Sequence, residues 1–267
     1  MTIKKSFPFE FVYQLFALVL SVIIVHSVYV TLVRPAATTI IAEQQIKIEA
    51  DDNYVPERSV YVLIRDFEQE ACFVLLFWAL AIIAYKVVRL LNERKLLDHA
   101  LIPTGDGISI LPEDSREYAR PIQSLDPSER RFLLPRSLLT GLHRFRSTRD
   151  IQSVATTVRE ICDAESERLD SELSMVRYIA WAIPSIGFIG TVRGIGQALA
   201  QAHKAVEGDI SGVTENLGVA FNSTFVALLL SIVLMFLMYQ LQLMQERLVL
   251  DSQEYADEHL ISKLRES

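Results

Sequence analysis

Long uncharged stretches alternate with strongly charged segments along the chain. Phe11–Val33 and Asn216–Gln245 contain no Asp, Glu, Lys or Arg. A helix needs about 20 apolar residues to cross a hydrocarbon core of roughly 30 Å. Ala71–Tyr85 and Tyr178–Val192 are shorter uncharged runs that resume beyond a basic residue. The pattern predicts four membrane-spanning helices, because long basic side chains can carry their charge to the membrane interface.

Apolar residues also recur every three or four positions in the charged segments that adjoin the third and fourth spans. Before the third span they are Val154, Val158, Ile161, Leu169, Leu173 and Val176, with a polar gap at Glu165. After the fourth they are Leu241, Met244, Leu248, Tyr255, Leu260 and Leu264. This spacing is typical of amphipathic helices and predicts one continuous helix from near 151 to near 202. We therefore expect an all-α integral membrane protein with four transmembrane helices, two of them extended into a helical cytoplasmic domain.

Basic residues near the span ends indicate the orientation, because they gather on the cytoplasmic side. Those of this chain fall on one side if both termini are cytoplasmic, and the external segment between the first two spans then has eight Asp or Glu against four Lys or Arg. The predicted organisation is a cytoplasmic N-terminus (1–10), a first span (11–33), a periplasmic segment (34–70), a second span (71–91), a cytoplasmic domain (92–177), a third span (178–202), a periplasmic loop (203–215), a fourth span (216–240) and a cytoplasmic C-terminal helix (241–267). A cleaved signal peptide is disfavoured, since Arg34-Pro35 follows the first run instead of a small-residue cleavage site.

The cytoplasmic domain opens with the stretch PTGDGISILPEDSREYARPIQSLDPSE, whose Pro, Gly and Asp content indicates an irregular linker. Asp126-Pro127-Ser128-Glu129 predicts a helix start, with Asp as N-cap and Pro in the first position. A basic cluster follows, made of Arg130, Arg131, Arg136, Arg144, Arg146 and Arg149. It suits a face near anionic lipid headgroups, and docking to an acidic partner is the alternative.

Composition and motifs argue against several other classes of protein. The 267 residues are 51% hydrophobic with a formal net charge of −7, which does not indicate nucleic-acid binding. The sequence has no Cys/His spacing of a metal site and no hydrolase or nucleotide-binding motif. We expect no enzyme activity, no metal and no cofactor. Cys72 and Cys162 lie on opposite sides of the membrane in this topology, which forbids a disulfide between them.

The third span contains a glycine-rich stretch, IPSIGFIGTVRGIG at 183–196. A phosphate-binding loop would need a preceding strand and a different glycine spacing. Gly190 and Gly194 instead form a GxxxG pair, which Ala198 and Ala202 continue. The fourth span has a comparable small face, formed by Ala220, Thr224, Ala227 and Ser231, with Ser223 beside it. Small residues let helix backbones approach closely in lipid, so both faces are suited to helix packing.

Two threonines fall at nearly the same predicted depth. Thr191 lies 13 residues from Tyr178, roughly 20 Å of helix, and Thr224 lies eight residues from Asn216, roughly 12 Å from the outer boundary. Both hydroxyls therefore belong to the outer half of the membrane core. A hydroxyl both donates and accepts, so with Ser223 they are candidate ion-pathway residues. Plain hydrogen bonding between helices is the alternative.

The third and fourth spans contain no Asp or Glu, and His26 is the sole histidine of the first span. A proton path through hydrocarbon normally needs a titratable group. We therefore expect another chain to supply the carboxylate, and His26 to be a packed or interfacial residue.

Leu169–Ile195, LDSELSMVRYIAWAIPSIGFIGTVRGI, resembles the signature of the MotA/TolQ/ExbB proton-channel family. The matching residues are Pro184, Gly187, Gly190, Thr191, Val192 and Gly194. The stretch AFNSTFVA resembles the family's second element through Ala220 and Thr224, while Ala227 stands where a glycine is expected. The resemblance covers about 169–245. Arg193 departs from the pattern, in which an aromatic residue is usual, and could contact an acidic group of a partner or extend toward the outer interface.

The resemblance implies a bacterial inner-membrane complex: a pentamer of this chain around two copies of a single-span MotB/ExbD/TolR-like partner. The partner's membrane aspartate would carry a proton past the threonines, and the flow would convert proton-motive force into mechanical work. The six small residues Pro184, Gly187, Gly190, Gly194, Ala220 and Ala227 would pack around the pore. Two other functions stay open: a receptor that senses through 35–69, and a scaffold whose small faces only assemble a complex. The process that the motor drives, and the choice of H⁺ or Na⁺, also stay open.

Overall fold

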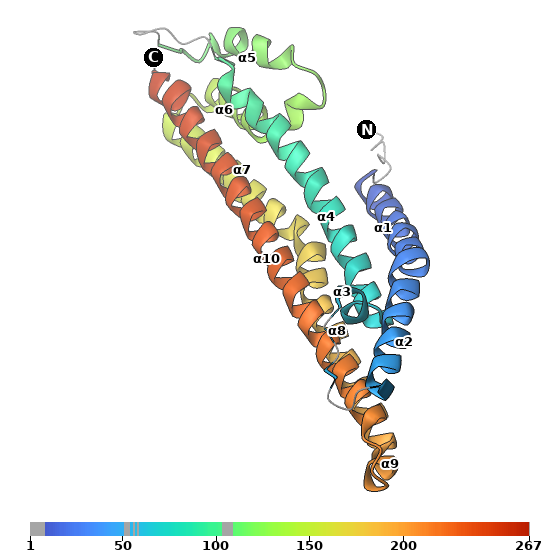
Figure 1. The fold of residues 1–267 in the computed structure, drawn as a ribbon. Coiled ribbons are helices and arrows are strands. Elements are labelled where there is room, and N and C mark those ends of the chain that lie inside the picture. Colours follow the sequence, from blue (N-terminus) through green and yellow to red (C-terminus); the bar gives the residue numbers. More distant parts are fainter. Residues whose placement is uncertain (1–8, 51–53, 56, 58, 103–108, 267) are drawn as a thin grey trace. The chain divides into compact units, whose positions relative to one another are not determined.

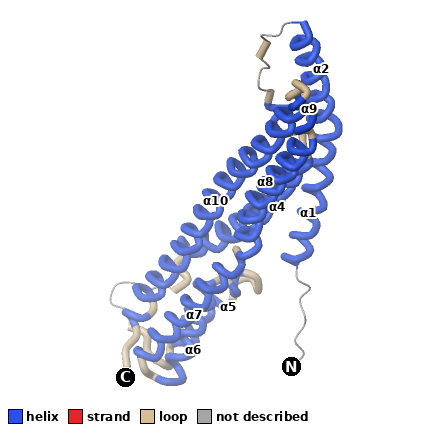
Figure 2. Tube along the Cα trace, turned by 90° about the horizontal axis from the view of Figure 1, so that it is seen from below, coloured by secondary structure: helices blue, strands red, loops and turns tan. Residues whose placement is uncertain are grey.

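The computed structural model describes residues 9–50, 54, 55, 57, 59–102 and 109–266, and within these residues the regular structure is helical. Figure 1 labels the helices along the chain, and Figure 2 shows them in blue with the connecting loops in tan. The α-helices are α1 (Phe9–Val28), α2 (Arg34–Ala50), α3 (Val60–Leu63), α4 (Phe67–Arg94), α5 (Ser115–Gln123), α6 (Leu133–Thr148), α7 (Ile151–Glu172), α8 (Ser174–Ala200), α9 (Ala202–Val206) and α10 (Ser211–His259). A π-helix covers Tyr29–Val33, and 3₁₀-helices cover Lys95–Asp98, Glu129–Arg131 and Ile261–Lys263.

Among the residues that the structure describes, four helical stretches are long and apolar enough to cross a membrane, the same number as the predicted spans. They are Phe9–Ile48, Phe67–Asp98, Ile151–Ala200 and Ser211–Lys263. Contacts divide the chain into two compact units. Residues 1–83 and 175–238 form the first unit, and residues 84–174 and 239–267 form the second.

In the first unit, the first helix continues past Val33 as α2, through a π-helical turn. Pro35 explains the turn, because proline has no N–H and its ring crowds the carbonyl four residues earlier. The N–H of Arg34 bonds instead to the carbonyl of Tyr29, five residues back. Such π-turns let a helix continue across a local disruption.

The second unit has its own apolar core, contributed by α5, α6, α7 and the end of α10. Leu138, Phe145, Val154, Leu260 and Ile110 are completely or almost completely buried there. The polar gap of the predicted amphipathic stripe is also buried: Glu165 pairs with Arg136 at 2.8 Å and with Arg168 at 3.3 Å. Its charge is thereby compensated inside the unit.

Two local predictions for this region are wrong. The stretch expected to be an irregular linker contains helix α5. Asp126-Pro127-Ser128-Glu129 does not begin a long helix, because only a 3₁₀ turn follows it and α6 begins at Leu133. The carboxylate of Glu93 accepts the backbone N–H of Leu133 at 2.6 Å and so caps α6 from a distant part of the chain.

The continuous helix expected from 151 to 202 is interrupted. Leu173 alone separates α7 from α8, and its N–H bonds to the carbonyl of Asp170, three residues back. Gln201 similarly separates α8 from α9. The apolar spacing predicts helical structure on both sides of each break but contains no signal for the tighter turn itself.

Candidate functional site

Helices α8 and the first half of α10 pack through their small residues, and they lie side by side in both views (Figures 1 and 2). The contacts follow an antiparallel order: Gly187 with Ala227, Gly190 with Ser223 and Gly194 with Ala220. All six residues are buried. A Cβ added to Gly190 would lie 2.5 Å from the Cβ of Ser223, and one on Gly194 would lie 2.8 Å from that of Ala220. This set of contacts, named the small-residue seam below, leaves no room for larger side chains.

Pro184 creates an acceptor in the seam that α10 satisfies. Proline has no N–H, so the carbonyl of Ala180, four residues earlier, loses its usual helical partner. The hydroxyl of Ser231 on α10 donates to this carbonyl at 3.1 Å. The proline thus frees a carbonyl for a hydrogen bond between the two helices. A residue with a backbone N–H at 184 would occupy this carbonyl within α8.

Thr191 and Thr224 meet across the seam, with their hydroxyl oxygens in hydrogen-bond contact. Thr191 Oγ1 lies 3.0 Å from the carbonyl oxygen of Ala220, and Thr224 Oγ1 lies 3.1 Å from that of Gly187. Thr191 Oγ1 also lies 3.4 Å from the carbonyl oxygen of Gly187. Two hydroxyl protons therefore serve four contacts, so acceptors outnumber donors. Both side chains are only half-buried. A pair with surplus acceptors and an open side can receive a hydrogen bond from a water or a protonated acid.

Ser223 lies apart from the two threonines. Its side chain is buried against Gly190, and its hydroxyl donates to the carbonyl of Val219 at 2.9 Å. It therefore lines the same seam without joining the threonine contact.

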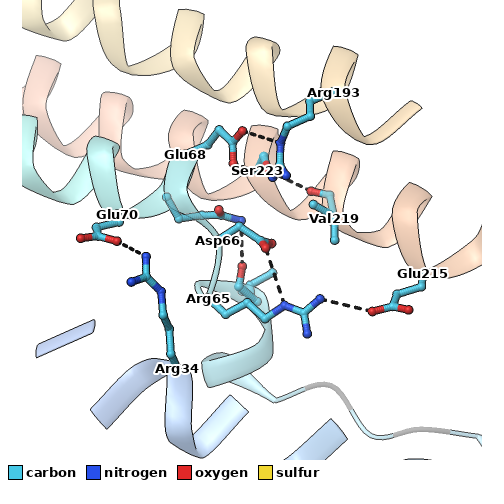
Figure 3. Close-up of polar contacts among 11 residues, drawn as sticks. Arg34, Arg65, Asp66, Glu68, Glu70, Arg193, Glu215, Val219 and Ser223 are labelled. Atoms are coloured by element: carbon cyan, nitrogen blue, oxygen red, sulfur yellow. Dashed lines mark hydrogen bonds and ion pairs between the residues drawn. The ribbon is translucent and has the colours of Figure 1, made fainter. Parts of the chain in front are cut away.

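Arg193 pairs with a carboxylate of its own chain (Figure 3). Its Nε and Nη2 donate to the two oxygens of Glu68, each at 2.7 Å. Glu68 lies in the first turn of α4, and its Cγ would lie 3.2 Å from a Cβ at Gly190. A carboxylate from the second span thus reaches the seam, although the third and fourth spans have none. This chain therefore has a carboxylate of its own at the seam, in addition to any that a partner chain supplies.

A second carboxylate of the same turn, Glu70, also has basic partners. One oxygen contacts the guanidinium of Arg34, and the other lies 2.7 Å from Nδ1 of His26. The guanidinium of Arg34 also lies over the ring of Phe67, 4.4 Å from its centre. His26 therefore belongs to a polar network between α1, α2 and α4.

Sequence reasoning missed Glu68 and Glu70 as site residues. They lie next to the uncharged run of the second span, and no local motif marks them. The available signal is Arg193, because a guanidinium within an apolar run needs a counter-charge, and Glu68 and Glu70 lie in the first turn of α4. The separation of 125 residues between Arg193 and Glu68 hides the pair from any local pattern.

Residues 130–254 match the model of the MotA/TolQ/ExbB proton channel family. The match includes α6, α7, α8 and most of α10, and so every residue of the small-residue seam. No curated protein and no solved structure matches the chain.

Proposed function

Because the chain belongs, through residues 130–254, to the MotA/TolQ/ExbB proton channel family, we propose that it is an ion-conducting subunit of a complex that converts proton-motive force into mechanical work. The contact between Thr191 and Thr224 carries the proposal. It places two partly exposed hydroxyl groups between two otherwise apolar helices. The ion is taken as a proton, which is the default of the family.

The remaining surface of these helices supports assembly with other chains. Phe188 on α8 and Phe221 and Phe225 on α10 are more than half exposed in the single chain. In the proposed complex, five copies bury part of this apolar surface and lipid covers the rest. Two copies of a single-span MotB/ExbD/TolR-like partner occupy the centre, and their membrane aspartate passes the proton along the threonines.

In the proposed complex, Arg193 pairs first with Glu68 of its own chain and only second with the partner. Its charge is neutralised by Glu68 within the chain, so it needs no partner to be stable. An acidic group of the partner that approaches the seam would compete with Glu68 for the guanidinium. The pair is then the point at which the partner's position alters the contact between α4 and α8.

The orientation proposed from the basic residues puts both termini in the cytoplasm and the complex in the bacterial inner membrane. The part of the second unit outside the predicted spans, residues 92–174 and 241–267, is then the helical cytoplasmic domain. The acidic segment 34–70 and the loop 203–215 face the periplasm.

Replacing the two threonines tests the proposal. The complex is purified from the source cells through a tag on this chain, and proton flux is measured in liposomes with a pH-sensitive dye. We expect Thr191→Val and Thr224→Val to preserve assembly and to lower flux by about tenfold or more, since a positioned proton-transfer group typically contributes at least about 100-fold. Thr214→Val is the matched control, because that exposed hydroxyl bonds only to the carbonyls of Ile210 and Ser211 at the start of α10.

Unchanged flux in both threonine variants would contradict the ion-path role and favour the receptor or scaffold. The mass of the purified complex tests the stoichiometry separately. A tetramer or a monomer of this chain would rule out the proposed pentamer without bearing on the threonines.

A further inference from the structure

A basic groove lies between α5 and α6 in the second unit, with a cavity volume of ≈ 450 Å³. On each helix the lining residues recur every three or four positions, so they lie on one face of that helix. The lining residues of α5 are Ser115, Arg116, Ala119, Arg120 and Gln123, and those of α6 are Leu139, Leu142, His143 and Arg146. Apolar residues form the floor, while the arginines and the histidine are exposed along the rim. Such a combination is typical of small-molecule sites.

The charged side chains that line this groove are all basic, while Asp114 and Glu117 adjoin Ser115 and Arg116 in the sequence. Three arginines and a histidine line it together, and no carboxylate is among the described residues that line it. Among the residues that the structure describes, neither the three guanidiniums nor the imidazole has an ion-pair partner. Like charges held around one cavity repel each other, and an anion bound among them relieves this repulsion.

Ser115 provides a second, independent indication of a ligand. Its side chain is 2% exposed and lines the groove, yet its hydroxyl has no hydrogen-bond partner among the residues that the structure describes. Buried hydroxyls without a partner are uncommon, because the missing bond costs free energy. Ser115 is also the first residue of the nine-residue helix α5, where unpaired N–H groups and the helix dipole favour an anion.

We propose that the groove between α5 and α6 binds an organic phosphate of nucleotide size from solution. The arginines hold the phosphate oxygens, for which their planar donors are suited. The hydroxyl of Ser115 donates to the same group, and the floor of Ala119, Leu139 and Leu142 receives the apolar part of the ligand. A concave site with an apolar floor favours a small molecule, whereas a bilayer surface suits a flat basic face.

Calorimetric titration of the purified full-length protein in detergent tests this proposal. The probes are ATP, AMP and pyrophosphate. We expect ATP to bind, and the double variant Arg120→Ala/Arg146→Ala to weaken binding by about tenfold or more, as charge-assisted hydrogen bonds are lost. Ser115→Ala is expected to weaken binding by about fivefold, in line with the loss of one hydrogen bond. Loss of the apolar contact should make pyrophosphate a weaker ligand than ATP.

The matched control is Arg131→Ala/Arg159→Ala, which removes the same charge from exposed positions outside the groove. Equal affinity in the groove and control variants would overturn the proposal, as would the absence of binding by all three probes. A third titration uses lipid nanodiscs with and without phosphatidylglycerol. Saturation by this lipid with no binding of the soluble probes would overturn the assignment to a ligand from solution.

Discussion

Arg193 on α8 and Glu68 on α4 form a two-point ion pair. Nε of the arginine donates to Oε1 of the glutamate and Nη2 donates to Oε2, each at 2.7 Å. The side chain of Glu68 is 12% exposed and that of Arg193 is 37% exposed. Water therefore screens the pair less than it screens a surface salt bridge. The pair also links two spans that the small-residue seam alone does not connect.

Removing one partner of this pair should destabilise the protein more than removing both. Arg193→Gln or Glu68→Gln leaves a poorly solvated charge, which we expect to cost about 1–3 kcal/mol, a value reduced from that of a fully buried pair. The double variant removes both charges and should recover most of that loss. The measurement is thermal unfolding of the purified protein in detergent, analysed as a double-mutant cycle.

Glu215→Gln is the control for this cycle, because Glu215 pairs with Arg65 at 3.3 Å while its side chain is 63% exposed. We expect an effect of about 0.5 kcal/mol or less from this exposed pair. A double variant as unstable as the sum of the single variants would contradict direct coupling between Arg193 and Glu68.

The fit of the small-residue seam predicts a compensating pair of substitutions. Gly190→Ala puts a methyl group within 2.5 Å of the Cβ of Ser223, and we expect this overpacking to cost about 1–3 kcal/mol. Ser223→Gly in the same chain removes the clash and should restore most of the stability. Gly196→Ala is the control, since a Cβ there meets no heavy atom within 4 Å. Thermal unfolding measures all three variants, and equal losses at Gly190 and Gly196 would contradict the packing.

The hydrophobic pattern predicted the four spans because an uncharged run of about 20 residues has few alternatives to a membrane helix. The spacing of Gly190, Gly194, Ala220 and Ala227 likewise identified two small faces, since helix periodicity places such residues on one side. Neither pattern predicts which residue of one small face lies opposite which residue of the other. That register depends on how α8 and α10 pack, and it decides that Gly190 meets Ser223.

The errors came from interactions between distant parts of the chain. Asp126-Pro127 has the local chemistry of a helix start, yet Glu93 supplies the cap and α6 begins at Leu133. The Pro- and Gly-rich stretch contains α5 because Ala119 and Ile122 are buried in the core of the second unit. Tertiary burial thus outweighed local propensity, and a single sequence contains no direct record of such contacts.

Ser231 and Pro184 should show coupled effects. Ser231→Ala removes the donor to the carbonyl of Ala180, which Pro184 cannot serve. We expect a loss of about 0.6–1.7 kcal/mol, the range of hydrogen bonds between membrane helices. In a Pro184→Ala background, the new backbone N–H can bond to Ala180, so the same serine substitution should cost less. Ser185→Ala is the control, because its exposed hydroxyl bonds within α8. Thermal unfolding in detergent checks the coupling, and equal losses in both backgrounds would exclude it.

Asp66 should make the stability fall as the pH rises. Burial raises the pKa of this carboxyl above its usual value of 3.8, and the guanidinium of Arg65 offsets part of the effect. Between the usual and the raised pKa, the folded state keeps a proton that the unfolded state releases. Folding stability therefore decreases with pH through this window and is constant above the raised pKa.

Asp66→Asn is expected to flatten this dependence and to raise the unfolding temperature at pH 7, because the amide avoids the cost of desolvating an ionised carboxylate. Unfolding midpoints measured between pH 4 and pH 7 give the comparison, with the exposed Glu43→Gln as control. If the asparagine variant kept the slope of the wild type, another group would be the source of the pH dependence. A lower midpoint for the variant at pH 7 would mean that the ion pair with Arg65, at 3.6 Å, outweighs the cost of burial.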